Sequence, residues 1–268
     1  MPELPEVETV CRTVAPHVVG RRIERLVVRD RRLRVPVDPG LPMALVGRVV
    51  TRVDRRAKFV CIHFRETDWL AVHLGMSGQL IVGTPSSEAK HVHVIMDFDD
   101  GTRMYFRDPR RFGSVRLVAE EAELGELGVE PLGDGFSVGH LQGLKRRHPR
   151  LSVKAMLMDS RRIVGVSNIY ANEALFRAGI RPGRRFARLS RREIEGLRRA
   201  VRDVLRLGIE LGGSSLMDYR DGDGKRGRFQ ETFAVYERKG EPCVRCGAPI
   251  RMRVIGGRSS FYCNRCQR

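Results

Sequence analysis

The first residues of the chain combine a proline with two carboxylates, a set that could act on a sugar aldehyde. Pro2 follows Met1, and removal of a methionine before a small residue would leave a secondary amine at the terminus. An α-amine is less basic than a lysine amine, so more of it is nucleophilic near neutral pH. Attack on a sugar aldehyde carbon would give an iminium ion, and Glu3 or Glu6 could protonate a sugar oxygen. The same carboxylates also suit an ordinary helix start, which leaves a purely structural interpretation open.

Four cysteines near the end of the chain have the spacing of a metal site. They form two Cys-x2-Cys pairs separated by 16 residues: Cys243, Cys246, Cys263 and Cys266. Two such turns at the ends of a hairpin can bring four thiolates into the closed tetrahedral set of a structural zinc. We therefore expect one zinc ion that supports the fold and leaves no open position for a reacting water. Cys11 and Cys61 stand in apolar contexts and are expected to be buried.

The surplus of positive charge lies in one half of the chain. The formal net charge is +18, but residues 1–130 carry 20 basic against 19 acidic side chains, whereas residues 131–268 carry 30 against 13. A basic surface favours a polyanionic partner, and nucleic acid is the commonest one. A general bias towards arginine, with 44 arginines and 6 lysines, could account for part of the surplus.

Composition excludes several classes of protein. Hydrophobic residues make up 41% of the 268, enough for two domains with their own cores. The longest apolar runs fall far short of the ~20 residues that a membrane helix needs. The acidic, proline-rich start is unlike a secretory signal. We expect a monomeric, cytoplasmic protein with no membrane partner and no nucleotide cofactor.

The elements that must position these residues follow from periodicity and turn signals. Apolar residues at helical intervals predict a short helix within 5–20, and many short β-type runs between 21 and 118 predict an antiparallel sandwich or barrel. A helical pattern follows over 140–211. Its longest helix has Ser190 and Glu193 in capping-box register.

Short motifs are spread along the whole chain. The opening MPELPEVETV is followed by RRAKF around Lys58, HLGMSGQL at 73–80, DPRRFG at 108–113 and NIYANEALFRAGI at 168–180. A Gly-Gly-Ser-Ser stretch at 212–215 and GGRSSFYC near the end complete the set. Together they resemble the formamidopyrimidine-DNA glycosylase family. The resemblance implies base-excision repair of damaged double-stranded DNA: removal of oxidised purines, including 8-oxoguanine and formamidopyrimidines, followed by strand cleavage at the abasic site through β,δ-elimination.

The resemblance implies a role for each candidate catalytic residue. Pro2 corresponds to the nucleophile that forms a Schiff base at C1′ of the damaged nucleotide, and Glu3 to the general acid that opens the sugar ring. Lys58 corresponds to the residue that assists elimination and binds phosphate; a lysine can lose a proton, whereas an arginine cannot. Arg258 corresponds to the zinc-finger arginine of δ-elimination, and Glu6 is a further active-site residue.

Other positions correspond to residues that contact the DNA. Met76, Arg110 and Phe112 resemble the residues that fill the space left by a flipped nucleotide; core packing is the alternative for the two apolar ones. Contacts near the DNA backbone or lesion are implied for His73, His91, Arg110, Arg150, Lys154 and Asn168. From its strand context alone, each histidine would be assigned a structural role.

The expected fold class is α+β: an N-terminal antiparallel β-sandwich with a flanking helix, then a helical domain and a zinc-ribbon hairpin. The resemblance identifies the helical part as a helix-two-turns-helix element. The expected boundaries are a catalytic sandwich over 1–123, a linker over 124–139, a DNA-binding domain over 140–230 with a lesion-binding loop at 213–229, and a zinc finger over 231–268.

Three positions differ from the residues that the family usually has. Ser167 stands in place of a glycine, Ser160 in place of an amide, and Arg228 in place of an aromatic residue in the lesion-binding loop. The backbone at 167 is expected to approach a phosphate. If that residue needs a positive φ, serine should weaken DNA binding.

Two other functions stay open at this stage. An enzyme resembling endonuclease VIII would use the same fold on oxidised pyrimidines, and cleavage of 8-oxoguanine opposite cytosine against thymine glycol would separate the two. The PELPE opening favours the purine enzyme. A non-catalytic zinc-ribbon DNA-binding protein would keep only the scaffold, and borohydride trapping of a covalent DNA adduct would exclude it.

Overall fold

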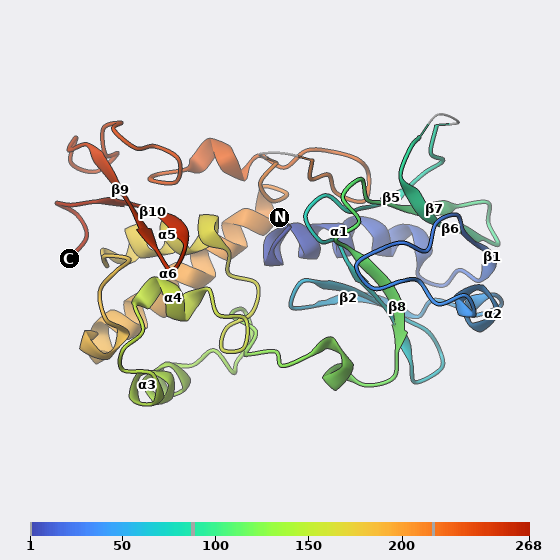
Figure 1. Cartoon of the computed structure of the whole chain (residues 1–268), viewed down its shortest axis with the longest axis horizontal. Helices are drawn as coiled ribbons and strands as arrows, with labels where there is room; N and C mark the ends of the chain where they lie inside the picture. Colours follow the sequence, from blue (N-terminus) through green and yellow to red (C-terminus); the bar gives the residue numbers. More distant parts are fainter. Residues whose placement is uncertain (1, 87–88, 216–217) are drawn as a thin grey trace. The chain divides into compact units, whose positions relative to one another are not determined.

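The computed structural model describes residues 2–86, 89–215 and 218–268, and Figure 1 labels its helices and strands. The described residues divide into two compact units. No helix within these ranges is both long and apolar enough to span a lipid bilayer.

The chain leaves the first unit and later returns to it. The first unit extends to Gly125 and includes Ile209–Gln230, and the second consists of Glu126–Gly208 and Glu231–Arg268. The expected DNA-binding domain over 140–230 includes the loop 213–229, whereas the described residues of this loop, 213–215 and 218–229, pack with the first unit. This loop has no hydrophobic periodicity, so its sequence gives no signal of the element on which it packs.

Helix α1 (Leu4–Val18) lies where the spacing of its valines predicts a helix. Glu3 is the N-cap, and Glu3 and Glu6 form a capping box in which each side chain accepts the backbone N–H of the other residue. Val7 and Val14 on the apolar face are fully buried. This face packs against strands of the first unit, and the opposite face carries polar side chains.

Two four-stranded antiparallel sheets form the body of the first unit. One sheet has the order β1 (Ile23–Val28), β6 (Val92–Phe98), β7 (Arg103–Arg107), β5 (Gln79–Val82). The other has the order β2 (Arg52–Arg56), β3 (Phe59–His63), β4 (Trp69–His73), β8 (Ser114–Val118). The short helix α2 (Leu41–Leu45) and the 3-10 turn η1 (Glu121–Leu124) complete the unit. The predicted antiparallel β-rich domain is confirmed.

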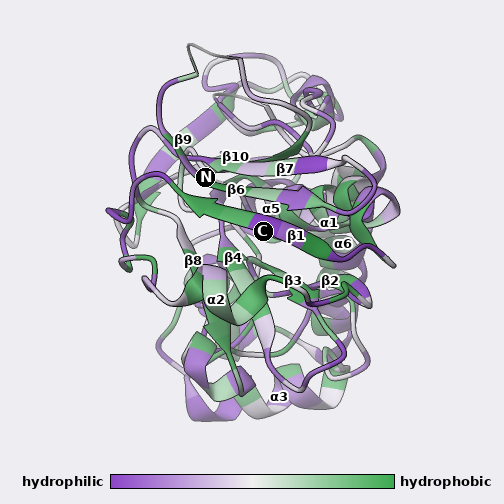
Figure 2. Ribbon diagram, turned by 90° about the vertical axis from the view of Figure 1, so that its right-hand side faces the viewer, coloured by the Kyte–Doolittle hydropathy of each residue, from purple (hydrophilic) through white to green (hydrophobic). Residues whose placement is uncertain are grey.

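Buried apolar side chains from both sheets and from α1 form one core. Strands β3 and β4 are coloured mainly as hydrophobic in Figure 2, in agreement with their buried central residues. The strands are joined by tight turns, such as Asp99–Gly101 between β6 and β7, where Gly101 has a φ of +83°. The sheets place the turns at their ends, and those turns carry Lys58, Met76, Arg110 and Phe112.

The second unit is built from helices and one hairpin. Its helices are α3 (Val138–Arg147), α4 (Val153–Leu157), α5 (Asn168–Ala178) and most of α6 (Arg191–Glu210), with the 3-10 turn η2 (Phe186–Arg188). The 3-10 turn η3 (Phe229–Thr232) spans the boundary at which the chain passes from the first unit back to the second. The predicted capping box of α6 is present: the N–H of Glu193 donates to Oγ of Ser190 at 3.2 Å, and the N–H of Ser190 donates to Oε2 of Glu193 at 2.7 Å. The predicted helical domain is confirmed.

The hairpin of the second unit joins β9 (Ile250–Ile255) to β10 (Arg258–Cys263). Its two-residue turn is Gly256–Gly257, with φ values of +57° and +72°. Two successive positive φ values are those of a turn that matches the twist of a hairpin, and glycine adopts them without strain. The turn therefore presents Arg258 as the exposed first residue of β10.

Candidate active site and zinc site

Pro2 and Glu3 are buried at the start of α1, and Glu3 is only 4% exposed. The Glu3 N–H donates to Oε2 of Glu6 at 2.8 Å, which fixes the direction in which the chain enters the helix. Pro5 lies in the first turn, where a missing N–H costs no helical hydrogen bond. The segment before α1 is therefore held in one path, with Pro2 directly next to a buried carboxyl group.

Lys58 approaches the same carboxyl group from the hairpin between β2 and β3. Its Nζ lies 2.6 Å from Oε2 of Glu3, and the two side chains are 22% and 5% exposed. The turn is set by Ala57, whose φ is +52° and whose carbonyl accepts a hydrogen bond from Arg55 at 2.9 Å. The hairpin thus brings a lysine amine to the N-terminus of α1.

Burial controls the protonation of Glu3. Removal from water raises the pKa of its carboxyl group above the ordinary value, and the neighbouring Lys58 offsets this only in part. A carboxyl group with a raised pKa keeps its proton closer to neutral pH, as a general acid requires. Glu3 can therefore hold a proton next to Pro2, with the Lys58 amine 2.6 Å from its Oε2.

Glu6 connects the start of the chain to the loop at 213–229. Its Oε1 accepts the N–H of Ser214 at 2.7 Å, although 208 residues separate the two. Its backbone carbonyl accepts the hydroxyl of Tyr219 at 3.1 Å. About two turns further along α1, the hydroxyl of Thr13 accepts the N–H of Gly222 at 2.8 Å. Glu6 was predicted only as an active-site carboxylate; its role in anchoring this loop has no local sequence signal.

Gly213 gives a physical reason for the Gly-Gly-Ser-Ser motif. Its φ is +82°, and a Cβ atom there would lie 2.8 Å from Cγ of Glu6. Gly227 faces it across the loop, where a Cβ atom would lie 2.2 Å from the carbonyl oxygen of Gly213. A side chain at either position would displace the loop from Glu6 or separate its two ends.

Met76, Arg110 and Phe112 lie on two adjoining turns of the sandwich. Met76 is 39% and Phe112 42% exposed, so neither is a core residue. The guanidinium carbon of Arg110 lies 4.9 Å from the centre of the Phe112 ring. Exposed apolar side chains beside an arginine are suited to entry between bases.

The two predicted histidines differ in environment. Burial, together with the charge of Lys58, lowers the pKa of His73 to about 4, so the ring is neutral. Its Nδ1 accepts the N–H of Gly75 at 3.1 Å and holds the turn before Met76. His91 is exposed and has a φ of +68°. His73 thus has a structural contact, and the proposed DNA contact of either residue stays a prediction.

Lys154 is 1% exposed, which its sequence context does not suggest. Its Nζ donates to the carbonyl oxygen of Ser259 and to Oγ of Ser260, each at 2.6 Å. Burial, with the charge of Arg258, lowers the pKa of the amine to about 7. Lys154 therefore fixes helix α4 to the hairpin that carries Arg258. Its expected contact with DNA stays a prediction.

The motif at 168–180 holds two buried residues that the sequence analysis did not select. Nδ2 of Asn172 donates to the carbonyl oxygen of Asn168 at 2.6 Å, and its Oδ1 accepts the N–H of Phe261 at 2.8 Å. The carboxylate of Glu173 accepts three successive backbone N–H groups, from Ala234 to Tyr236, at 2.9–3.0 Å. The sequence does offer a signal for both residues: a carboxylate or amide on the buried face of a helix must have hydrogen-bond partners, so it indicates a structural contact.

The structure shows the backbone conformation or hydrogen bonds at the three positions that differ from the usual family residues. Ser167 has a φ of −84°, which any residue adopts, so serine at this position causes no backbone strain. The conditional expectation of weakened DNA binding through strain is therefore not supported. Ser160 accepts the N–H of Gly128 through its carbonyl oxygen. The N–H of Arg228 donates to Leu211 at 2.8 Å, a backbone contact that does not depend on the side chain.

Two exposed arginines and one half-buried asparagine complete the predicted set in the second unit. Arg150 follows α3, Arg258 follows the hairpin turn, and Asn168 is the first residue of α5. The first N–H groups of a helix are free to bind an anion, so Asn168 stands at a suitable position for a phosphate.

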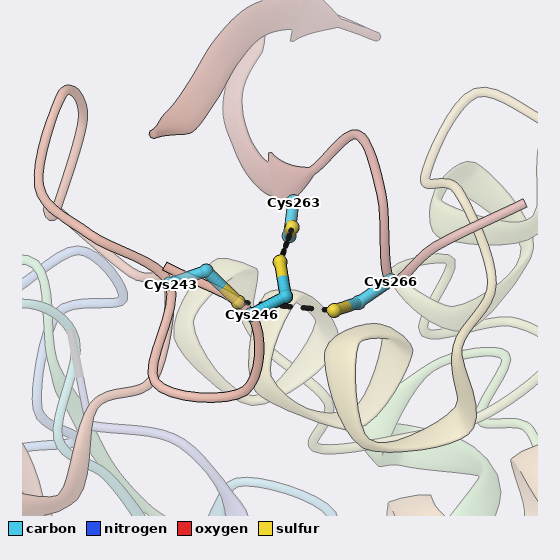
Figure 3. Close-up of side chains that lie close together, drawn as sticks. All are labelled: Cys243, Cys246, Cys263 and Cys266. Atoms are coloured by element: carbon cyan, nitrogen blue, oxygen red, sulfur yellow. Dashed lines mark hydrogen bonds between the residues drawn. The ribbon is translucent and has the colours of Figure 1, made fainter. Parts of the chain in front are cut away.

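The four cysteines of the predicted metal site come together, and Figure 3 shows their sulfur atoms converging. All four Sγ atoms lie within 4.8 Å of one another, with Cys246 and Cys263 at 3.5 Å and Cys243 and Cys266 at 3.9 Å. Four thiolates around a zinc ion at ~2.3 Å require sulfur separations of about 3.8 Å. The cluster therefore fits tetrahedral zinc, and full coordination by sulfur gives the metal a structural role.

Three segments match known protein families. Residues 1–115 match the formamidopyrimidine-DNA glycosylase N-terminal domain, residues 127–220 match the formamidopyrimidine-DNA glycosylase H2TH domain, and residues 240–268 match a zinc finger found in FPG and IleRS. The last match agrees with the cysteine cluster, so these residues form a zinc finger whose four cysteines bind the metal.

Proteins similar over the full chain bear one name. Formamidopyrimidine-DNA glycosylases of Neisseria meningitidis serogroup A and Syntrophotalea carbinolica are 44% and 45% identical, each over 100% of both chains. The crystal structure of the MutM (Fpg) protein from Thermus thermophilus superposes with a TM-score of 0.85 at 40% identity, covering 99% of this chain and 98% of that one. Wild-type Lactococcus lactis Fpg in complex with N7-benzyl-Fapy-dG DNA superposes with a TM-score of 0.88 at 30% identity over 100% of both chains.

The cysteine cluster predicts that zinc supports the β9–β10 hairpin. Cys263→Ser removes one of four thiolates and should abolish stoichiometric zinc binding, because the site has no spare ligand. Metal analysis should then find no zinc, and amide hydrogen exchange in β9 and β10 should rise to the rate of an open hairpin. Cys61→Ala, a buried thiol outside the cluster, serves as control and should retain zinc. Protected β9 and β10 amides in a zinc-free Cys263→Ser protein would contradict a supporting role.

Proposed function

The chain belongs to the formamidopyrimidine-DNA glycosylase family, and we propose that its reaction proceeds through the amine of Pro2. The protein is a base-excision-repair DNA glycosylase that acts on oxidised purines. Full-length relatives named for formamidopyrimidine favour purine lesions over the pyrimidine lesions of the endonuclease VIII-like alternative. The observation that carries the mechanism is the buried Glu3–Lys58 pair next to Pro2.

Pro2 is the nucleophile in this proposal. Once Met1 is removed, the lone pair of its secondary amine attacks C1′ of the damaged nucleotide, and the bond to the base breaks with its electron pair leaving on the base. The amine N–H proton passes to the departing base, which restores a lone pair on the nitrogen. Helix α1 begins two residues after Pro2, and the positive end of its dipole disfavours protonation of the Pro2 amine. More of the amine is therefore in its unprotonated, nucleophilic form. Burial of Pro2 limits access of water to the covalent intermediate.

Glu3 supplies the proton for ring opening. Transfer of this proton to the ring oxygen of the sugar breaks the C1′–O bond, and the nitrogen lone pair forms the iminium ion. Its raised pKa suits this role because the acid is needed in its protonated form. Lys58, 2.6 Å away, stabilises the carboxylate that remains and can take part in later proton transfers.

The iminium ion then acts as an electron sink for strand cleavage. Loss of a proton from C2′ expels the 3′ phosphate, and a second elimination expels the 5′ phosphate. Lys58 assists the first elimination and binds phosphate, and Arg258 at the tip of the β9–β10 hairpin assists the second. The exposure of Arg258 leaves its guanidinium available to a phosphate.

Binding of damaged duplex DNA follows from the family and from charge. Relatives have been solved with DNA containing a lesion or an abasic site. Residues 131–268 carry 30 basic and 13 acidic side chains, a surplus of 17 for contacts with phosphates. We propose that Met76, Arg110 and Phe112 fill the space left by the flipped nucleotide. The residues proposed to lie near the DNA backbone or the lesion are Arg150, Lys154, Asn168, His73 and His91. The working form is proposed to be a cytoplasmic monomer without a nucleotide cofactor.

A free Pro2 amine is the first requirement to test. A preparation that retains Met1, or carries an N-terminal tag, has no amine at Pro2 and should bind lesion DNA but not cleave it. Pro2→Gly keeps a primary amine and should retain part of the cleavage. Gel-shift and cleavage assays on the same 8-oxoguanine duplex separate binding from chemistry. Normal cleavage by a preparation that mass spectrometry shows to retain Met1 would disprove the proposal.

Glu3 should separate base excision from cleavage of a preformed abasic site. Glu3→Gln should slow excision by about 100-fold or more, because it removes the acid, whereas an abasic site already offers an open-chain aldehyde. In the unsubstituted protein, the protonated fraction of Glu3 falls as pH rises through its raised pKa, so excision should lose activity on the alkaline side of that pKa. Single-turnover rates on both substrates across pH measure this.

Glu8→Gln is a matched control on α1, where Glu8 pairs with Arg12 and Arg55 away from the Glu3 carboxyl group. It should leave the ratio of the two rates unchanged. Equal loss of both activities in Glu3→Gln would show that Glu3 is not the acid for ring opening.

A further inference from the structure

Asp108 is a fully buried carboxylate directly after β7, the first residue of the turn that carries Phe112 and adjacent to the turn that carries Met76. A buried carboxylate is costly unless hydrogen bonds replace its water. The reaction proposed above does not use it. The role of Asp108 must therefore be inferred from the groups that its carboxylate and backbone contact.

Both oxygens of Asp108 are used to join the two turns. Oδ1 accepts the hydroxyl of Ser77 at 2.6 Å and the N–H of Arg110 at 3.2 Å. Oδ2 accepts the N–H of Gly113 at 2.8 Å. The Ser77 hydroxyl also accepts the N–H of Arg110 at 3.2 Å. Ser77, the neighbour of Met76, is thus bound to the first part of the turn that presents Phe112, and Asp108 in turn holds Gly113 at the end of that turn.

The backbone of Asp108 is held as firmly as its side chain. Its N–H donates to the carbonyl of His91 at 3.0 Å, and Nε2 of the buried His93 donates to its carbonyl oxygen at 3.0 Å. His91, just before β6, and His93, within β6, therefore fix the point where the turn 108–113 leaves the sheet. The carboxylate then extends from this fixed point to Ser77 and Gly113.

The two turns also touch without side chains between them. A Cβ atom on Gly75, whose φ is +62°, would lie 2.4 Å from the carbonyl carbon of Phe112. A Cβ atom on Gly113 would lie 2.6 Å from the carbonyl oxygen of His73. Arg111 has a φ of +58°, a conformation that a residue other than glycine adopts only when its surroundings hold it there. The hydrogen bonds of Asp108 at 110 and 113 enclose this residue.

We propose that Asp108, acting through Ser77, is a positioning residue that locks the turns 75–78 and 108–113 into one preformed wedge. The proposal rests on the function proposed for Met76, Arg110 and Phe112. Inserting side chains into a base stack must offset the few kcal/mol needed to unstack and extrude a base. Two turns already fixed before binding lose little conformational freedom on insertion, so more of the contact energy remains for extrusion.

Ser77→Ala is the sharpest test, because it removes the hydroxyl that joins the turns and leaves Asp108 its bonds to Arg110 and Gly113. Extrusion can be followed by stopped-flow fluorescence of a purine analogue placed next to 8-oxoguanine, and excision by single-turnover cleavage. Ser77→Ala should slow extrusion by about five- to tenfold, the value of one lost hydrogen bond. Cleavage of a preformed abasic site, which has no base to unstack, should change less.

A purely structural defect is excluded by combining variants. Phe112→Ala removes the wedge itself, so Ser77→Ala should add almost nothing to extrusion in that background, a non-additivity expected for residues acting as one unit. Asp108→Asn should behave as a stronger form of Ser77→Ala. Asp97→Asn, which breaks an ion pair with Arg103 elsewhere in the same sheet, is the control and should leave extrusion unchanged.

The results distinguish this inference from the proposed function. If Phe112→Ala slows extrusion and Ser77→Ala does not, or if the two effects add fully, Asp108 and Ser77 do not position the wedge. If Phe112→Ala itself leaves extrusion unchanged, the wedge function fails and this inference fails with it. Slowed extrusion in Ser77→Ala that disappears in the Phe112→Ala background supports the inference.

Discussion

The contact between the buried Glu3 and Lys58 is the interaction on which the proposed active site depends. A buried carboxyl group is costly unless hydrogen bonds replace its water, and the Lys58 amine supplies such a contact. The pair also requires accurate backbone geometry on both sides. Helix α1 must begin directly after Glu3, and the β2–β3 hairpin must turn at Ala57, whose positive φ directs the chain into Lys58. The start of α1 and the turn of the β2–β3 hairpin together determine which groups surround Pro2.

The second constraint is the anchoring of a distant loop by Glu6. One oxygen of this carboxylate caps α1 at Glu3, and the other accepts the N–H of Ser214. A single side chain therefore couples the start of the chain to a loop that begins after α6. The close approach at Gly213 allows the contact, because any side chain there would meet Glu6. The proposed active site in the first unit is thus assembled from the start of the chain and from a segment more than 200 residues later.

Much of this could be predicted from local patterns. The Cys-x2-Cys pairs, the capping box at Ser190 and Glu193, and the valine spacing of α1 each describe contacts within a few residues, and each is present. Contacts between distant segments could not be predicted. The packing of loop 213–229 on α1 and the burial of Lys154 under the hairpin depend on hydrogen bonds across long separations. The φ of Ser167 could not be predicted either, because it depends on tertiary context. Its value of −84° shows that serine in place of the usual glycine causes no backbone strain.

The central claim is that a secondary amine at the chain start, not a lysine, forms the bond to DNA. The most direct test is reduction of the covalent intermediate with borohydride on an 8-oxoguanine duplex, followed by proteolysis and mass spectrometry of the peptide that carries the sugar. The account predicts that the sugar is attached to the nitrogen of Pro2 in the N-terminal peptide, in Lys58→Ala as well as in the unsubstituted protein. A sugar attached to Lys58, or the absence of any covalent adduct under conditions of active cleavage, would contradict it.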